Sequence, residues 1–257
     1  METRATGQIE QAREWVAAAN SVVVLTGAGI SAESGLPTFR GPGGLWRNFR
    51  PEQLATPEAF HRDPKLVWEW YDWRRQVHAK CQPNAGHRAL VELERRKESF
   101  LLVTQNVDSL HERAGSRNII HLHGSLWRIR CIACGKEEAN EQVPLSPLPP
   151  HCACGGMERP AVVWFGEALP MDALEAAFTA AQRAELVLVV GTSSMVYPAA
   201  ALPRVGLEHD ARVIEVNPEP TDLSASADLS LRGLAGEILP QIVAEASGQS
   251  RHCRDGT

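Results

Sequence analysis

The chain has 257 residues, which is enough for one large domain or two modest ones. Its 44% hydrophobic and 22% charged residues are average for a globular protein, and 20 glycines with 17 prolines are too few for a collagen-like or low-complexity chain. The formal net charge of −5 removes the general electrostatic reason to expect a nucleic acid or an anionic membrane as a partner.

Apolar residues at helical spacing predict a helix over residues 8–19, and the apolar run that follows predicts a buried strand over 22–25. This strand leads into Gly27-x-Gly29-x-x-Ala32, which is typical of the turn from the first strand of a parallel sheet into its first helix. Further apolar runs that end in polar residues lie at 100–103, 186–190 and 212–216. Such strands, separated by helical stretches, predict an α/β fold whose parallel sheet is covered on both faces.

Two segments interrupt this alternation of strands and helices. Residues 41–83 are rich in Trp, Arg and Pro and are predicted to be helical, whereas residues 127–160 carry four cysteines and little periodicity. We interpret both as insertions that form a smaller domain over one edge of the sheet and leave a cleft beside it.

The turn at Gly27 to Ala32 is the first candidate site. Its glycines would let the backbone approach a pyrophosphate, and the helix that follows would offer free N–H groups at its N-terminus. A strained turn without any ligand is the alternative. A dehydrogenase would place an Asp or Glu about 20 residues further on, but Gly41 to Trp46 is predicted to be a loop, so this class is disfavoured.

The chain is expected to be cytoplasmic. Its longest uncharged stretch, residues 186–203, contains glycine and two prolines and makes a poor membrane span. The N-terminal region lacks an apolar run before a small-residue cleavage site, so the sequence predicts no secretory signal there. Cysteines in such a compartment are expected to be reduced thiols or metal ligands.

Four of the six cysteines form two close pairs, Cys131-x-x-Cys134 and Cys152-x-Cys154. This spacing predicts one structural Zn²⁺ held by four thiolates, with no open coordination position. Four unrelated buried thiols are the alternative. Cys81 and Cys253 are expected to be plain thiols.

The sequence His121-Leu122-His123-Gly124 is the third candidate. A histidine can act as a general base near neutral pH, although a single histidine is more often structural. Because alternation points His121 and His123 to the same side of an extended segment, spacing does not choose between them.

Taken together, these motifs resemble the sirtuins, which are NAD-dependent protein-lysine deacylases. The similarity runs in order from about residue 20 to 240. It rests on the runs Gly27–Arg40, Thr104–Asp108, His123-Gly124, Val163–Glu167 and Gly191–Ser193, and on the two cysteine pairs. The resemblance implies a Rossmann-like domain with a smaller helical and zinc-binding domain, and it implies that NAD and an acylated lysine enter the cleft from opposite sides.

The resemblance places the NAD-binding domain at residues 1–40, 84–126 and 161–257. The smaller domain would combine a helical module, 41–83, with a zinc-binding module, 127–160, whose metal ligands would be Cys131, Cys134, Cys152 and Cys154. The cofactor-binding residues implied by the resemblance are Gly27, Ala28, Gly29, Ile30, Ser31, Ala32, Glu33, Pro37, Thr38, Phe39, Arg40, Trp46, Gln105, Asn106, Val107, Asp108, Gly191, Thr192, Ser193, Asn217, Pro218, Glu219 and Ala235.

In the family, the histidine that corresponds to His123 is catalytic. It removes a proton from a ribose hydroxyl after the acyl oxygen has attacked the ribose carbon, and the products are free lysine, nicotinamide and O-acyl-ADP-ribose. The resemblance further implies an extended substrate peptide that adds as a strand. The residues expected to bind it are Val163, Trp164, Phe165, Gly166 and Glu167.

Tyr71 and Arg74 are three residues apart in a predicted helix and therefore share one face. An Arg fork and a Tyr hydroxyl suit a carboxylate, so the pair would favour succinyl, malonyl or glutaryl lysine. Both residues match the carboxylate-binding pair of the desuccinylating class III sirtuins, and Ala55 matches the small residue that widens their pocket. The alternative from the helical pattern alone is a solvated Arg beside a packed Tyr, in a plain deacetylase.

Two rival functions remain from the sequence. A mono-ADP-ribosyltransferase would use the same NAD site, and a zinc-stabilised binding module would show no turnover. For the leading hypothesis, a deacylase with desuccinylase and deacetylase activity, the partners are acylated lysines of proteins, with no membrane and no direct nucleic-acid binding expected. Residues 246–257 are expected to form a disordered tail.

Overall fold

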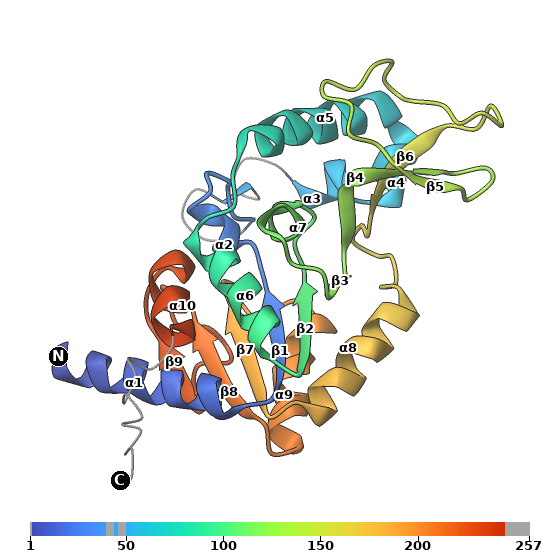
Figure 1. Ribbon diagram of the computed structural model, residues 1–257. Coiled ribbons are helices and arrows are strands. Elements are labelled where there is room, and N and C mark those ends of the chain that lie inside the picture. Colours follow the sequence, from blue (N-terminus) through green and yellow to red (C-terminus); the bar gives the residue numbers. More distant parts are fainter. Residues whose placement is uncertain (1, 40–43, 46–49, 245–257) are drawn as a thin grey trace, which may run out of the picture.

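The computed structural model describes residues 2–39, 44–45 and 50–244. Its centre is a six-stranded sheet of order β3-β2-β1-β7-β8-β9, in which every pair of neighbours is parallel (Figure 1). The strands are β1 Ser21–Thr26, β2 Ser99–Thr104, β3 Ile119–His121, β7 Leu186–Val190, β8 Arg212–Val216 and β9 Leu229–Leu231. The predicted α/β fold with a parallel, Rossmann-like sheet is confirmed.

One face of this sheet is covered by α1 Glu2–Ala18, α6 Ala85–Arg96 and α10 Ala235–Val243. Val22 and Val24 of β1 point to this face and share a core with Leu90 of α6 and Leu239 of α10. Because side chains alternate along a strand, Val23 points to the other face. A buried two-sided sheet explains why its central strands are continuous runs of Val and Leu.

The other face is covered by α8 Met171–Arg183 and α9 Leu202–Glu208. Ala177 and Ala181 of α8 are fully buried there against Val23 and Leu25 of β1. Shorter elements beside the strands are α2 Gly29–Ala32, α7 Leu110–Ala114 and the 3₁₀ turn Ala199–Ala201. No helix in the described part of the chain combines the length and the apolar character needed to cross a membrane.

A second sheet lies beyond the carboxyl ends of the large sheet's strands (Figure 1). It is antiparallel, with the order β5-β4-β6. Its strands are β4 Gly124–Cys131, β5 Glu137–Ala139 and β6 Glu158–Val162, and the helices beside it are α3 Pro51–Leu54, α4 Pro57–Arg62 and α5 Pro64–Lys80. Trp68 of α5 is fully buried and donates its indole N–H to the Glu158 carbonyl, which fixes α5 to β6.

Local sequence signals set the ends of the two longer helices here. Thr56 and Asp63 each accept a backbone N–H at a helix start, from Ala59 and Leu66, and a proline occupies the first turn of each helix. Helix α5 consequently begins at Pro64. This start sets which of its residues face the carboxyl ends of the large sheet's strands, which we call the carboxyl edge.

Candidate active site

The loops after β1 and β7 are in direct backbone contact. The Gly27 N–H donates to the Val190 carbonyl at 3.0 Å, and the Gly29 N–H donates to the Gly191 carbonyl at 2.8 Å. A Cβ at Gly29 would lie 2.6 Å from the Gly191 Cα, and Gly191 itself has a φ of +62°. The missing Cβ atoms of these glycines let the two loops touch. Their predicted approach to a pyrophosphate stays a prediction.

Polar side chains after β2 join this pair of loops. Asn106 donates to the Gly27 carbonyl at 3.1 Å, and the Ser31 hydroxyl donates to the Asp108 carboxylate at 3.0 Å. Asp108 also accepts the Leu110 N–H, while burial raises the pKa of its carboxyl. Gln105 extends the network to the β7 loop, because its amide donates to the Thr192 hydroxyl at 3.0 Å.

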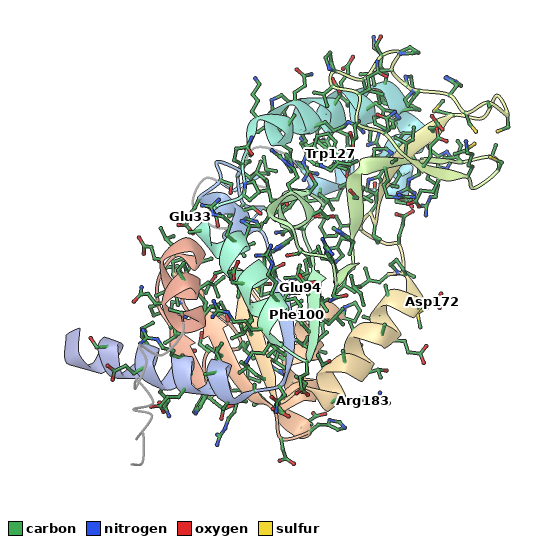
Figure 2. The ribbon with its side chains drawn as sticks, viewed as in Figure 1. Glu33, Glu94, Phe100, Trp127, Asp172 and Arg183 are labelled. Atoms are coloured by element: carbon green, nitrogen blue, oxygen red, sulfur yellow. The ribbon has the colours of Figure 1, made fainter. Side chains whose placement is uncertain are left out.

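The loop after β8 and the start of α10 complete the group of segments at the carboxyl ends of the strands. Asn217 donates to the Glu219 carbonyl at 2.7 Å, which closes the loop on itself. The Gly236 N–H, beside the buried Ala235, donates to the Glu33 carboxylate at 2.7 Å. Figure 2 shows Glu33 beside α10, so this contact ties α10 to the segment that follows α2.

The other residues expected to bind the cofactor occupy the same four loops. Ala28, Ile30, Ala32, Pro37, Thr38 and Phe39 follow β1, Val107 follows β2, Ser193 follows β7 and Pro218 follows β8. The Ile30 side chain is fully buried in the core of the large sheet, which leaves its backbone as the part that faces the loops. Arg40, Trp46 and the tail from 246, with Cys253, lie outside the described residues.

The structure separates the two candidate histidines. His123, between β3 and β4, has its Nδ1 at 2.9 Å from the Gln105 carbonyl. A carbonyl only accepts, so Nδ1 carries the proton, and the Nε2 lone pair has no partner among the described residues. Burial lowers the pKa of His123, so the ring is neutral at pH 7. His121 instead pairs through Nε2 with the Glu112 carboxylate at 2.7 Å, and this contact outweighs burial and raises its pKa.

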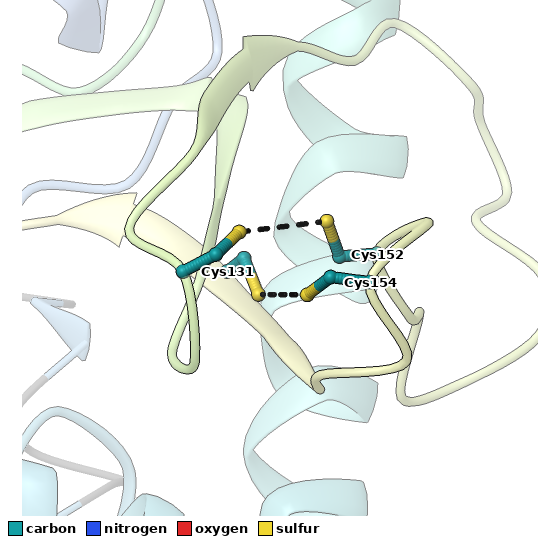
Figure 3. Close-up of side chains that lie close together, drawn as sticks. Cys131, Cys152 and Cys154 are labelled. Atoms are coloured by element: carbon teal, nitrogen blue, oxygen red, sulfur yellow. Dashed lines mark hydrogen bonds between the residues drawn. The ribbon is translucent and has the colours of Figure 1, made fainter.

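Four cysteine sulfurs converge between the turn after β4 and the turn before β6 (Figure 3). All four lie within 4.8 Å of one another, with 3.5 Å between Cys131 and Cys154 and 3.9 Å between Cys134 and Cys152. A tetrahedral Zn²⁺ with bonds of about 2.3 Å places its sulfurs roughly 3.8 Å apart, so the donor set fits one zinc ion. With four protein ligands the zinc is structural, as predicted.

Tyr71 and Arg74 are both buried on α5, at 2% and 5% exposure. The Arg74 guanidinium carbon lies 5.1 Å from the Phe39 ring centre and 4.9 Å from that of Trp70. Among the described residues no carboxylate forms an ion pair with Arg74, and its Nε has no hydrogen-bond partner. The alternative of a solvated arginine is therefore wrong.

The segment expected to bind a peptide runs beside this helix. The Val163 N–H donates to the His123 carbonyl, and the Phe165 N–H donates to the Ala55 carbonyl, each at 2.9 Å. Trp164 is buried, whereas Phe165 is 45% exposed. The Glu167 carboxylate is already engaged, because it receives the Arg159 guanidinium at 2.5 and 2.9 Å.

Arg159 was not among the residues expected from the sequence. It is a buried charge at the start of an apolar strand, beside Pro160. A charged residue in such a run signals a buried ion pair, because an unpaired charge would be costly there. Its partner Glu167 is separated from it by the whole apolar run, and only the fold brings the two together.

A cavity of about 560 Å³ lies elsewhere, between α8 and the amino-terminal halves of β1 and β2. Its polar lining includes Ser21, Ser99, Asp172 and Arg183, of which the last two lie toward opposite ends of α8 (Figure 2). None of the residues predicted to bind cofactor or substrate lines it. The chemistry-bearing residues gather instead at the carboxyl edge of the sheet.

The model of the Sir2 family matches residues 27–198, a range that runs from the first glycine loop through both cysteine pairs to the loop after β7. An NAD-dependent protein deacylase of Aquifex aeolicus (strain VF5) is 56% identical over 223 residues, which cover 86% of this chain and 93% of that protein. NAD-dependent protein deacylase 2 of Pyrobaculum aerophilum is 53% identical over 237 residues, covering 92% and 95%.

Solved structures agree with these sequence similarities. A complex of a Sir2 homologue with NAD matches with a TM-score of 0.86 and 51% identity, covering 91% of this chain and 92% of that one. A complex of a Sir2 mutant with p53 peptide and NAD matches with a TM-score of 0.81 and 32% identity, covering 91% and 96%.

Proposed function

Because the chain belongs to the Sir2 family and is an NAD-dependent protein deacylase, we propose that it removes acyl groups that end in a carboxylate, such as succinyl and malonyl, together with acetyl groups. The substrates are acylated lysine side chains of proteins. A cytoplasmic location, where the zinc thiolates would stay reduced, suits this role.

The observation that carries the proposal is the state of Arg74. A buried guanidinium without a carboxylate partner is costly, because removing a charge from water is offset only by a counter-charge and by hydrogen bonds. Burial lowers the pKa of Arg74, and Asp108, whose field acts in the opposite direction, forms no ion pair with it. A substrate carboxylate would supply the partner that the described residues do not, and would be held by a planar fork of N–H donors.

Tyr71 adds a second donor beside Arg74. Its hydroxyl is buried one helical turn before Arg74, and the guanidinium carbon lies 5.6 Å from its ring centre. Ala55 is small and buried in the same apolar cluster as Tyr71, so its methyl side chain would obstruct an acyl chain longer than acetyl less than a larger side chain would. A carboxylate at the far end of that chain would meet both donors.

For the cofactor, we place NAD along the loops that follow β1, β2, β7 and β8. The glycine contact between Gly27, Gly29 and Gly191 supports this placement, since it fixes backbone groups at the carboxyl edge where ligands of such sheets bind. Ser31, Asn106 and Asp108 offer hydroxyl, amide and carboxyl groups to ribose hydroxyls. Asn217, Glu219 and Ala235 would lie along the adenosine half.

NAD would supply the ribose carbon that receives the acyl oxygen as nicotinamide leaves, and a water molecule would then release the lysine amine. The products would be free lysine, nicotinamide and O-acyl-ADP-ribose. His123 acts as the general base. Its Nδ1–H is held by the Gln105 carbonyl, so the neutral ring presents Nε2 to take a proton from a ribose hydroxyl. The zinc ion has no vacant position for water and takes no part in this step.

The peptide around the acylated lysine would add as a strand along residues 163–167. Phe165 is exposed, and Gly166 has a φ of +87°, so the backbone turns immediately after the segment. Backbone hydrogen bonds would provide affinity with little preference for sequence.

The test compares kcat/KM for one peptide that carries either succinyl-lysine or acetyl-lysine, with products identified by mass spectrometry. We expect the ratio of succinyl to acetyl kcat/KM to fall at least about tenfold in Arg74→Met, because hydrogen bonds to a charged group contribute about 1.5–3 kcal/mol. Arg62→Met, an exposed arginine on α4, is the matched control. An unchanged ratio in Arg74→Met would indicate a plain deacetylase, and ADP-ribosylated protein without O-acyl-ADP-ribose would indicate a transferase.

A further inference from the structure

Tyr71 and Trp164, from α5 and from the segment after β6, share a buried hydrogen bond. We propose that Trp164 is a specificity-determining residue, because its indole N–H forces the Tyr71 hydroxyl to donate its own proton to the carboxylate of the acyl group. Arg159 and Glu167 act as positioning residues that hold Trp164 in place. This inference rests on the proposed preference for acyl groups that end in a carboxylate.

The direction of the hydrogen bond follows from the chemistry of the two groups. The Trp164 Nε1 lies 2.9 Å from the Tyr71 oxygen, and an indole N–H can only donate. The phenol oxygen therefore accepts this bond, and its O–H proton must point elsewhere. No second hydrogen bond of the Tyr71 hydroxyl is found within the described part of the chain, so the proton remains available to a ligand.

The protonation state of Tyr71 supports this assignment. Burial raises the pKa of its phenol, although the neighbouring Arg74 acts in the opposite direction. The hydroxyl is thus protonated at neutral pH and can donate. Accepting a hydrogen bond polarises an O–H group and makes it a stronger donor, so the indole contact both orients and strengthens the group beside Arg74.

Trp164 is held on its ring and on its backbone. The Arg159 guanidinium carbon lies 3.4 Å from the centre of the Trp164 ring. The same guanidinium donates to both carboxylate oxygens of Glu167. Glu167 Oε2 also accepts the backbone N–H of Trp164 at 2.8 Å. One arginine and one glutamate thus hold both the plane of the indole and the segment that carries it.

This arrangement differs from ordinary core packing in one respect. Phe60 also contacts the Trp164 ring, at 5.3 Å between ring centres, and that contact would be made equally by a phenylalanine at position 164. The N–H is the part of Trp164 that packing does not require. Trp164→Phe removes the indole N–H but still fills the apolar cluster, so it tests the orientation of Tyr71 separately from packing.

The experiment is a double-mutant cycle on Trp164→Phe and Tyr71→Phe, with the succinyl-to-acetyl ratio of kcat/KM as the readout. We expect Trp164→Phe to lower this ratio about threefold to tenfold, the range for one hydrogen bond. In the Tyr71→Phe background, Trp164→Phe should leave the ratio unchanged, because the hydroxyl that it orients is gone. Taking the ratio within each variant removes losses due to folding.

Arg159→Lys tests the positioning residues. Lysine keeps the charge opposite Glu167 but loses the flat fork that stacks on the indole, so the ratio should fall in the same direction as in Trp164→Phe. Arg128→Lys is the matched control, since Arg128 lies on the neighbouring strand β4 and pairs with Glu137 on the surface. Its ratio should equal that of the wild type.

A wild-type ratio in Trp164→Phe, or independent effects of the two substitutions, would overturn the inference while leaving a carboxylate preference that Arg74→Met abolishes. Failure of the proposed function has another signature. In that case the wild-type enzyme shows no preference for succinyl-lysine, and Arg74→Met does not change the ratio.

Discussion

His123 donates its Nδ1 proton to the Gln105 carbonyl at 2.9 Å, and Gln105 in turn donates its side-chain amide to Thr192. The His123 ring is thereby tied to the loop after β2, and that loop is tied to the loop after β7. The tautomer that leaves Nε2 free is consequently set by the fold and not by the substrate.

The first prediction concerns the pH dependence of activity that follows if His123 is the general base, as we propose. Burial lowers the pKa of His123 below the usual 6.5, so the ring stays neutral and active at pH 6.5, and activity falls only at lower pH. The acid limb of kcat/KM against pH should therefore lie below 6.5. His123→Ala should lose about 10²-fold to 10⁴-fold in kcat/KM, with no such limb. An acid limb above pH 7 would contradict a base lowered by burial.

The second prediction concerns the metal. Chelation of zinc, or Cys154→Ser, should reduce both thermal stability and deacylation, because the four thiolates join the turn after β4 to the turn before β6. Metal analysis should give one zinc per chain in the wild type. Cys81→Ser is the control, since Cys81 lies outside the cluster. Full activity in a metal-free, folded protein would contradict a structural ion.

The sequence predicts the large sheet well because its central strands are buried on both faces and so read as unbroken runs of Val and Leu. The edge strands β3 and β9 were not predicted. Each has three residues, which is too short for a recognisable period, and β3 contains the polar His121. Their positions depend on pairing with β2 and β8, which is tertiary information.

Sequence reasoning found the side chains of the candidate site but not their partners. Spacing alone did not choose between His121 and His123, and only the family resemblance singled out His123. The contacts that separate the two rings, with Glu112 and with the Gln105 carbonyl, come from the fold. Sequence reasoning likewise missed Arg159, whose partners lie across a strand and a turn. Residue types reveal what chemistry is available, whereas orientation and protonation follow from contacts between distant segments.

The third prediction concerns acid stability through His87. This fully buried residue lies in the first turn of α6, and its Nδ1 accepts the Asn84 N–H in a capping box. Burial lowers the pKa of His87 to about 4, and Arg88 acts in the same direction. The unfolded chain binds the proton near pH 6.5, so stability is complete above that value and falls as the pH drops from 6.5 toward 4.

The measurement is the free energy of unfolding in urea at pH 7 and at pH 5. His87→Gln keeps a side chain that can accept the Asn84 N–H but does not titrate. The free energy of unfolding should fall between these two pH values in both proteins, and the fall should be smaller in the variant by on the order of 1–2 kcal/mol. His61→Gln is the control, because His61 lies on α4, far along the chain from this cap. Equal losses in the wild type and His87→Gln would contradict the prediction.

The fourth prediction concerns Glu215, a carboxylate on β8 that is 1% exposed. It accepts hydrogen bonds from the hydroxyls of Ser224 and Ser230 at 2.7 and 2.8 Å and from Thr221, and it pairs with Arg232 at 3.1 Å. Arg232 also donates to the Glu219 carbonyl at 3.0 Å. Glu215 thus anchors the loop that carries Asn217 and Glu219, both of which we place beside the adenosine half of NAD.

Glu215→Gln should therefore raise KM for NAD several-fold, with a smaller effect on kcat, and should destabilise the fold by about 1–3 kcal/mol.

Burial acts to raise the pKa of Glu215, but the hydroxyl donors and Arg232 outweigh it and lower the pKa. The stabilisation is then present above the unfolded value of about 4.3 and is lost as the pH falls through the lower folded value. The stability difference between the wild type and Glu215→Gln should consequently shrink below pH 4.3, whereas the exposed Glu208→Gln should match the wild type throughout. A variant that loses stability but keeps the wild-type KM for NAD would show that Glu215 supports the fold without positioning the cofactor loop.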